Sequence, residues 1–163
     1  MKTADLLARI EGDWGRERPD LDPDPMLTVI AVQRTSQTLQ AALDAFFARH
    51  DLTPSAFDVL ATLRRSAPPG GLTLGELGTL MAVTPPAVTK RVDRLERRGW
   101  VARLPDPLDR RTVRAALTPE GRAAVDRLLE AHVAHEQALL RNLTPEDRAT
   151  LRGLLLRIAP QNE

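Results

Sequence analysis

WVARLPDPLDRRTVRAALTPEG, residues 100–121, contains the clearest change of pattern in the chain. Its two ends, residues 100–104 and 112–117, have the composition of short strands, whereas residues 105–111 are rich in proline, aspartate and arginine. Proline and aspartate favour turns, so this pattern predicts two short strands joined by a turn. We therefore expect a two-stranded ribbon with a charged tip.

Two short helices are predicted before this ribbon. Thr73 and Glu76 have the spacing of a capping box at the start of the first helix. Thr84-Pro85 predicts the start of the second helix, with the threonine hydroxyl as its cap, and Gly99 ends it. The apolar positions of the second helix recur at helical spacing: Val88, Val92 and Leu95. Two helices with a tight connection, followed by a ribbon, form a winged helix-turn-helix.

Most of the remaining chain is predicted to be helical. Residues 1–18 have the apolar spacing of a short amphipathic helix, and a proline-rich linker separates them from a long helix over residues 26–50. Thr-Pro pairs begin two further helices within residues 119–158. The predicted fold class is mainly α with a small β-wing, in one compact domain whose winged helix-turn-helix module covers residues 53–118.

The composition excludes several classes of protein. The 163 residues contain no cysteine, which excludes disulfides, thiolate metal sites and thiol-based sensing. No apolar run approaches the ~20 residues of a membrane helix, so we expect a cytoplasmic protein with no membrane contact. Without a phosphate loop or nucleophile motif, we expect neither an enzyme nor a cofactor. His132, His135 and Glu136 have helical spacing, but they are too few for a closed metal site, and a solvated face or dimer contact is the preferred interpretation.

Charge is unevenly distributed along the chain. The net charge is only +1, yet residues 84–114 contain nine basic and four acidic side chains, a local balance of +5. Because the apolar stripe of the second helix must face the core, Thr89, Lys90, Arg94 and Arg97 lie on its exposed sides. Such a helix can enter the major groove of DNA, where its side chains meet base edges and the positive end of its dipole meets phosphate. A solvated helix in an arginine-rich protein is the alternative.

The tip of the ribbon contains Asp109, Arg110 and Arg111 between the two strands. These residues have no role in a core, whereas an arginine held by a neighbouring carboxylate suits insertion into a narrow minor groove. We expect Asp109 to orient Arg111 in this way. An exposed surface turn is the alternative.

The sequence DPLDRR at residues 106–111, followed by LTPEG at residues 117–121, resembles the wing signature of the MarR family. The resemblance extends from Met26 to Ile158 and implies a homodimer built by the helices at 26–50 and 119–158, bound to a pseudo-palindromic DNA operator. It also implies that the following residues of the recognition helix contact DNA, with Arg111 in the minor groove: Pro85, Pro86, Thr89, Lys90 and Arg94. The two prolines depart from the small polar residues usual in the family, which favours apolar contact with thymine methyl groups.

The additional N-terminal helix is similar to that of the urate-responsive subgroup of this family. That subgroup has a pocket of one tryptophan, one aspartate and two arginines, and matching motifs in this chain contain Trp14, Asp58, Arg91 and Arg103. A flat indole, planar cations and a carboxylate acceptor suit a purine anion. The resemblance therefore implies a repressor released from its operator by urate or a related purine anion.

Other interpretations stay open from the sequence. Each of the four residues also has an ordinary structural role available, as packing, surface charge or a phosphate contact. A regulator that senses a different aromatic carboxylate, such as salicylate, is the main alternative to urate. A winged-helix module that binds protein through its ribbon is a third interpretation, from a different functional class.

Overall fold

The computed structural model describes residues 2–109 and 111–158. It confirms a mainly helical chain with a small antiparallel sheet. The chain divides into two compact units, Met1–Pro54 and Ser55–Glu163, which we call the N-terminal and C-terminal units. No helix in the described part of the chain is long and apolar enough to cross a membrane.

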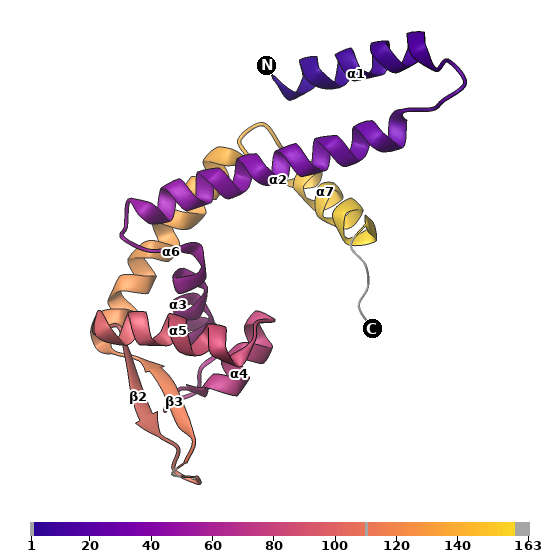
Figure 1. Ribbon diagram of the computed structural model, residues 1–163. Helices are drawn as coiled ribbons and strands as arrows, with labels where there is room; N and C mark the ends of the chain where they lie inside the picture. The colour runs from indigo at the N-terminus through magenta and orange to yellow at the C-terminus, as the bar shows by residue number, and fades with distance from the viewer. Residues whose placement is uncertain (1, 110, 159–163) are drawn as a thin grey trace. The chain divides into compact units, whose positions relative to one another are not determined.

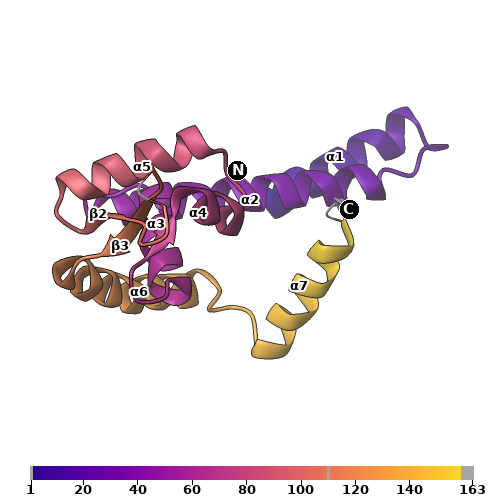
Figure 2. The same cartoon turned by 90° about the horizontal axis from the view of Figure 1, so that it is seen from below.

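The N-terminal unit is a pair of helices. α1 (Thr3–Glu17) folds back along α2 (Asp24–Ala48), as Figures 1 and 2 show. In the turn between them, the guanidinium of Arg18 donates two hydrogen bonds of 2.8 Å to the carboxylate of Asp20. The amphipathic N-terminal helix, the proline-rich linker and the long second helix were all predicted by the sequence.

The C-terminal unit contains the winged helix-turn-helix. Its elements in chain order are α3 (Pro54–Ser66), β1 (Leu72–Thr73), α4 (Leu74–Met81), α5 (Pro85–Arg97), β2 (Val101–Pro105), β3 (Val113–Leu117), α6 (Pro119–Leu139) and α7 (Pro145–Ile158). The side chains of Val88, Val92 and Leu95 are fully buried, which confirms that this stripe of α5 faces the core. They share the core with α3, α4, β2 and α6 through Leu60, Leu77, Val101 and Val125, which are equally buried or nearly so.

The sheet has one strand more than the sequence predicted. Its strand order is β1-β3-β2, and every pairing is antiparallel. β2 and β3 form the expected ribbon, with Val101 opposite Leu117 and Pro105 opposite Val113. β1 adds only Leu72 and Thr73, and two residues are too few to show the alternation of apolar and polar side chains by which a strand is predicted. Figure 2 shows the sheet between α5 and α6.

The start of α6 is packed directly against the beginning of the wing. The hydroxyl of Thr118 accepts a 2.9 Å hydrogen bond from the N–H of Gly121 and donates one of 2.7 Å to the carbonyl of Gly99. A Cβ on Gly121 would lie 1.9 Å from the carbonyl oxygen of Trp100, so no larger residue fits there without a backbone shift. The glycine of the LTPEG motif is therefore a packing requirement.

Replacing this glycine tests the packing. We expect Gly121→Ala to lower the free energy of unfolding by about 1–3 kcal/mol, because the added methyl group forces the backbone of Trp100 away from α6. Gly153→Ala is the matched control, since a Cβ at Gly153 meets nothing within 4 Å and alanine favours a helix by up to about 1 kcal/mol. Urea denaturation at one protein concentration measures both. Equal midpoints for Gly121→Ala and the wild type would contradict this account.

Candidate nucleic-acid interface

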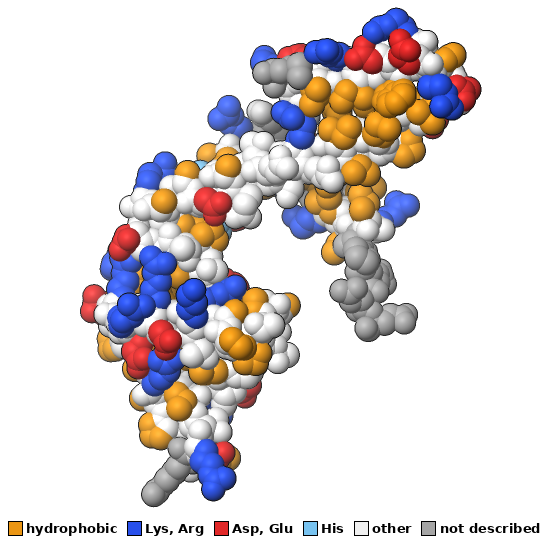
Figure 3. All heavy atoms as spheres, viewed as in Figure 1, with side chains coloured by type: hydrophobic (Ala, Val, Ile, Leu, Met, Phe, Trp, Pro, Cys, Tyr) orange, Lys and Arg blue, Asp and Glu red, His pale blue; other side chains and the backbone are white. Residues whose placement is uncertain are grey.

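The outward face of α5 is polar and basic. Thr89, Lys90 and Arg94 are all exposed, on the side of the helix opposite its buried apolar stripe. Figure 3 shows lysine and arginine side chains gathered over the region that α5 occupies in Figure 1, and again at the tip of the wing. The hydroxyl of Thr89 donates a 3.1 Å hydrogen bond to the carbonyl of Pro85, so its remaining role toward a base is that of an acceptor.

The beginning of α5 differs from the prediction. Pro85 and Pro86 are both exposed and occupy the first two helical positions, where neither has an N–H. The next two N–H groups, of Ala87 and Val88, both donate to the carbonyl of Thr84, at 3.0 and 3.2 Å. The predicted hydroxyl cap is wrong, because the Thr84 side chain makes no capping hydrogen bond.

This arrangement limits the N–H groups that the α5 N-terminus can offer to a phosphate. A helix N-terminus holds phosphate through free N–H groups, and the prolines remove two of these donors. The following donors are occupied by a carbonyl within the chain. The backbone N–H groups at the start of α5 are therefore missing or already occupied, which leaves side chains as the groups available to a partner there.

The wing loop is organised around the carboxylate of Asp106, which is only 7% exposed. It accepts hydrogen bonds from the N–H groups of Leu108 at 2.7 Å and Asp109 at 3.1 Å, and from Nε of Arg114 at 2.6 Å. The hydrogen bond from Leu108, followed by that from Arg114, lowers the pKa of Asp106. Because each of these bonds favours the ionised form, the carboxylate holds the loop at neutral pH.

Arg114 extends this network to the rest of the module. Its Nη1 donates a 2.8 Å hydrogen bond to the carbonyl of Gly71, immediately before β1. The same nitrogen lies 3.9 Å from a carboxylate oxygen of Glu76, the capping residue of α4. One guanidinium thus joins the wing loop, the chain that enters β1, and the first turn of α4.

The predicted role of Asp109 needs correction. Its carboxylate accepts hydrogen bonds from the backbone N–H of Arg111 at 2.9 Å and from the hydroxyl of Thr112 at 3.0 Å. It therefore shapes the turn instead of holding the Arg111 guanidinium, and the side chain of Arg111 is exposed. Arg110, the third predicted residue of the tip, lies outside the described residues.

Arg103, predicted as a ligand contact, joins the wing to α5. Its guanidinium forms ion pairs with Asp93, at 2.5 Å, and with Glu96. The Arg103 side chain is 25% exposed, and both carboxylates lie on α5 at a spacing of three residues. We call this group the Arg103 clamp.

The structure distributes the other predicted ligand residues over both units. Asp58 on α3 and Arg91 on α5 are half-buried in the C-terminal unit, together with Arg103. Neither Asp58 nor Arg91 forms an ion pair or side-chain hydrogen bond with any described residue. Trp14 is half-buried on α1 in the N-terminal unit.

The acidic residues near α5 and the wing are occupied by these contacts. Asp93 and Glu96 bind Arg103, Asp106 binds Arg114, and Asp109 binds backbone. In contrast, five cations between residues 84 and 114 have no ion pair within the described part of the chain, although Arg97 donates to the backbone carbonyl of Asp93: Lys90, Arg91, Arg94, Arg97 and Arg111. The positive charge available to a partner is therefore less opposed than the local balance of the sequence suggests.

Comparison with known proteins identifies the family. A family model described as MarR family matches residues 50–112. The HTH-type transcriptional regulator PecS of Dickeya dadantii is 39% identical to this chain, over 93% of the chain and 92% of PecS. The multiple antibiotic resistance protein MarR of Escherichia coli is 34% identical, over 79% of the chain and 88% of MarR. The chain belongs to the MarR family.

Solved structures of the family have the same fold. An Escherichia coli MarR mutant complexed with operator DNA matches with a TM-score of 0.67 and 30% identity, over 90% of this chain and 98% of that one. BpsR of Bordetella bronchiseptica, whose DNA binding is regulated by 6-hydroxynicotinic acid, matches with a TM-score of 0.70 and 28% identity, over 81% and 92%. DNA binding by a winged helix and transcription regulation are thus properties of the family, and these relatives are regulators, not enzymes.

Two features of this MarR-family chain were not found by sequence reasoning. The network of Asp106 and Arg114 was not predicted, although the first residue of the DPLDRR signature is its centre. His132 was interpreted as a solvated or dimer-contact residue, but its ring packs edge-on against Phe57, with centroids 4.9 Å apart. Its Nε2 lies 3.3 Å from a carboxylate oxygen of Glu136. No group of three side chains able to hold a metal occurs in residues 2–109 and 111–158.

Neutralising the wing carboxylate tests its role. An amide in Asp106→Asn has a single acceptor oxygen and cannot accept from the loop N–H groups and Arg114 together. We expect affinity for the DNA upstream of its own gene to fall on the order of tenfold, even though losing a negative charge by itself favours DNA binding. Fluorescence anisotropy at fixed salt measures this. Asp126→Asn on α6, which removes the same charge and an exposed ion pair with Arg64 of α3, is the control.

The pH dependence provides a second readout of the same substitution. Because the folded state lowers the pKa of Asp106, its stabilisation is present above the unfolded value of about 4 and is lost as pH falls through the folded value. The Asn variant lacks this contribution. Affinity of Asp106→Asn equal to that of Asp126→Asn would show that the wing does not depend on this carboxylate.

Proposed function

We propose that this chain is a homodimeric repressor that is released from operator DNA by a small anionic aromatic metabolite, urate or a related purine anion. The observation that carries the DNA-binding part is the unpaired cationic surface of α5 and the wing, next to acids that are already occupied. The observation that supports the ligand part is a set of two arginines, one aspartate and one tryptophan in the motif context of the urate-responsive subgroup.

Two elements contact DNA in this proposal. α5 enters the major groove, where Lys90 and Arg94 meet base edges or phosphates and Thr89 accepts a hydrogen bond from an exocyclic amine. The methylenes of Pro85 and Pro86 contact thymine methyl groups. Arg111 at the wing enters the minor groove, where a narrow A·T-rich region attracts a guanidinium. The structural likeness to MarR complexed with operator DNA supports this docking.

Exposed apolar side chains support dimer formation. On α7, Leu154 is 48% exposed, Leu156 is 69% exposed and Ile158 is 62% exposed. On α2, Val29 is 55% exposed. Rows of exposed aliphatic side chains on terminal helices are typical of subunit interfaces. A two-fold dimer places its two recognition helices on half-sites about one helical turn, roughly 34–36 Å, apart.

The ligand part depends on how Arg91 and Arg103 are held. Arg91 has no acid partner among the described residues, whereas Arg103 is held by the two carboxylates of its clamp. A purine anion that exchanges for one carboxylate at Arg103 disturbs the contact between β2 and α5. The negative charge of the purine anion also repels the carboxylate of Asp58. A coupling free energy of ~1–3 kcal/mol then changes DNA affinity by roughly 5–150-fold.

An aromatic carboxylate is the second candidate ligand. The likeness to BpsR, whose DNA binding is regulated by 6-hydroxynicotinic acid, favours this class. A carboxylate accepts forked hydrogen bonds from a guanidinium, as a purine anion can through a carbonyl oxygen and the adjacent deprotonated ring nitrogen. The two candidates differ in ring N–H donors, for which Asp58 provides an acceptor.

Substitutions on the wing and on α5 separate the two DNA contacts. We expect Arg111→Ala to weaken binding to all duplex sequences. The slope of log affinity against log salt concentration should become shallower by about one, the value for one lost phosphate contact. We expect Lys90→Ala also to relax base preference, because Lys90 lies on the helix that faces base edges. Anisotropy titrations at several salt concentrations, with the upstream DNA and a scrambled duplex, measure both. Wild-type affinity in Arg111→Ala would exclude the minor-groove contact.

Substitutions outside the DNA-reading elements test the ligand. Trp14→Ala and Asp58→Ala should leave affinity for the upstream DNA nearly unchanged, because neither residue lies on α5 or the wing. Both should raise the urate concentration needed to release that DNA by on the order of tenfold. Asp126→Ala, another acid-to-alanine change in the C-terminal unit, is the control. If all variants respond to urate as the wild type does, the ligand set is wrong; release by salicylate but not urate would replace the purine with a carboxylate.

A further inference from the structure

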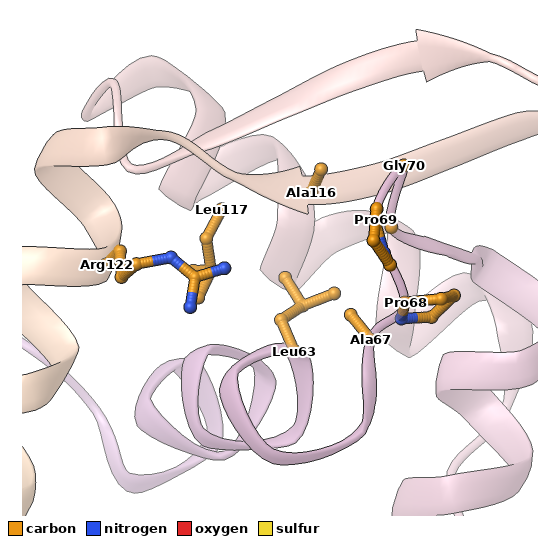
Figure 4. Close-up of a pocket in the computed structure, with 9 residues that line it drawn as sticks. Leu63, Ala67, Pro68, Pro69, Gly70, Ala116, Leu117 and Arg122 are labelled. Carbon is orange, nitrogen blue, oxygen red and sulfur yellow. The ribbon is translucent and has the colours of Figure 1, made fainter.

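The C-terminal unit has a recess on its surface. It has a volume of about 290 Å³ and is enclosed by the C-terminal end of α3, the loop to β1, strand β3 and the first turn of α6 (Figure 4). Backbone and side chains both line it, and the side chains are apolar apart from one arginine; the larger ones are Leu63, Pro68, Pro69, Ala116, Leu117 and Arg122. None of the residues predicted to contact ligand or DNA lines it.

The loop that forms one wall is held in a defined conformation. Gly70 and Gly71 have positive φ angles, +100° and +86°, which suit glycine. The N–H of Gly71 donates to the carbonyl of Pro68 at 3.0 Å and closes a turn. A Cβ on Gly71 would lie 2.2 Å from the carbonyl oxygen of Ala115, so the glycine allows the loop to lie directly against β3. The recess is therefore bounded by fixed backbone.

Arg122 is the polar group of the recess. Its side chain extends past Leu117 toward Leu63, while Pro68 and Pro69 lie on the opposite side (Figure 4). The Arg122 guanidinium has no hydrogen bond or ion pair with any described residue, although three other arginines of this unit are paired with acids. A guanidinium beside apolar side chains and without an acid partner is complementary to a ligand anion.

The lining selects the kind of anion. The flat faces of two prolines and the methyl groups of two leucines favour an aromatic ring over a sugar or an inorganic ion. No lining side chain is an acceptor, so the ring N–H groups of a purine have no side-chain partner there. The volume lies at the lower end of ligand pockets, roughly 300 Å³, and suits a single ring.

We propose that this recess is a second small-molecule site, which binds a monocyclic aromatic carboxylate with its carboxylate on Arg122 and its ring between the prolines and the leucines. The site is independent of the proposed urate set. Its occupant contacts both the loop that leads into β1 and the strand β3. Gly71 in that loop is joined to the wing base by Arg114, so an occupied recess lies against the same backbone that positions the wing.

Benzoate and its uncharged analogue benzamide test the proposal. We expect benzoate to shift the backbone amide NMR signals of Gly70, Gly71, Ala116 and Leu117 in a saturable titration of the full chain, and benzamide to bind about tenfold more weakly. In Arg122→Gln, the preference for benzoate over benzamide should disappear. Arg127→Gln, an exposed arginine of α6 that does not line the recess, should keep the wild-type preference.

A second variant tests the apolar walls. Ala116→Leu places a larger side chain in the recess and should abolish binding of both compounds, and its urea midpoint reports whether the fold is retained. Trp14→Ala should bind benzoate as the wild type does, which separates this site from the urate set. Unchanged benzoate preference in Arg122→Gln, or shifts confined to the surroundings of Arg91 and Arg103, would overturn the proposal.

Discussion

The cross-link made by Arg114 fixes the geometry of the DNA-reading module. The wing is a loop of seven residues between two short strands, and nothing in its own sequence is apolar enough to anchor it. Its position depends on the carboxylate of Asp106, which is itself held by Arg114, and Arg114 is held by the carbonyl of Gly71. Because the partners come from three separate segments, the orientation of the wing and the entry into α4 are set by one guanidinium. A charged pair that is nearly buried is tolerated here because its hydrogen bonds are satisfied.

The basic residues of this region therefore fall into two groups with different roles. Arg103 and Arg114 bind carboxylates, and Arg98 lies over the ring of Trp100 with its guanidinium carbon 4.0 Å from the ring centroid. These side chains act as structural ties, and they also occupy the acids that would oppose DNA. Lys90 and Arg94 are then left to define the outer surface. Counting charges along the sequence cannot separate the two groups, because the separation depends on which side chains the strands and α5 bring together.

The parts predicted from the sequence were those with a local cause. The capping box at Thr73 and the burial of the α5 stripe follow from chemistry within a few residues, and both were confirmed. The missed features depend on contacts between distant segments. β1 exists because Leu72 and Thr73 pair with Ala115 and Arg114, more than forty residues away. The cap at Thr84 failed because two prolines follow it, and the helix start is closed by a carbonyl instead of a hydroxyl.

For the candidate ligand set too, the sequence indicates which residues take part but not which contacts they make. A resemblance can indicate which side chains take part, but the Arg103 clamp could be found only from the structure. Since both carboxylates of the clamp lie on α5 and the cation lies on β2, an anion at Arg103 competes with a contact inside the DNA-reading module. The Arg103 guanidinium can then either bind a ligand anion or hold α5 and the wing at their present spacing. Linkage requires that DNA, by favouring one spacing, lowers the affinity for the ligand by the same factor by which the ligand lowers the affinity for DNA. The strength of that factor depends on how tightly Asp93 and Glu96 hold Arg103, so these two acids set the sensitivity of the proposed switch without touching either DNA or ligand.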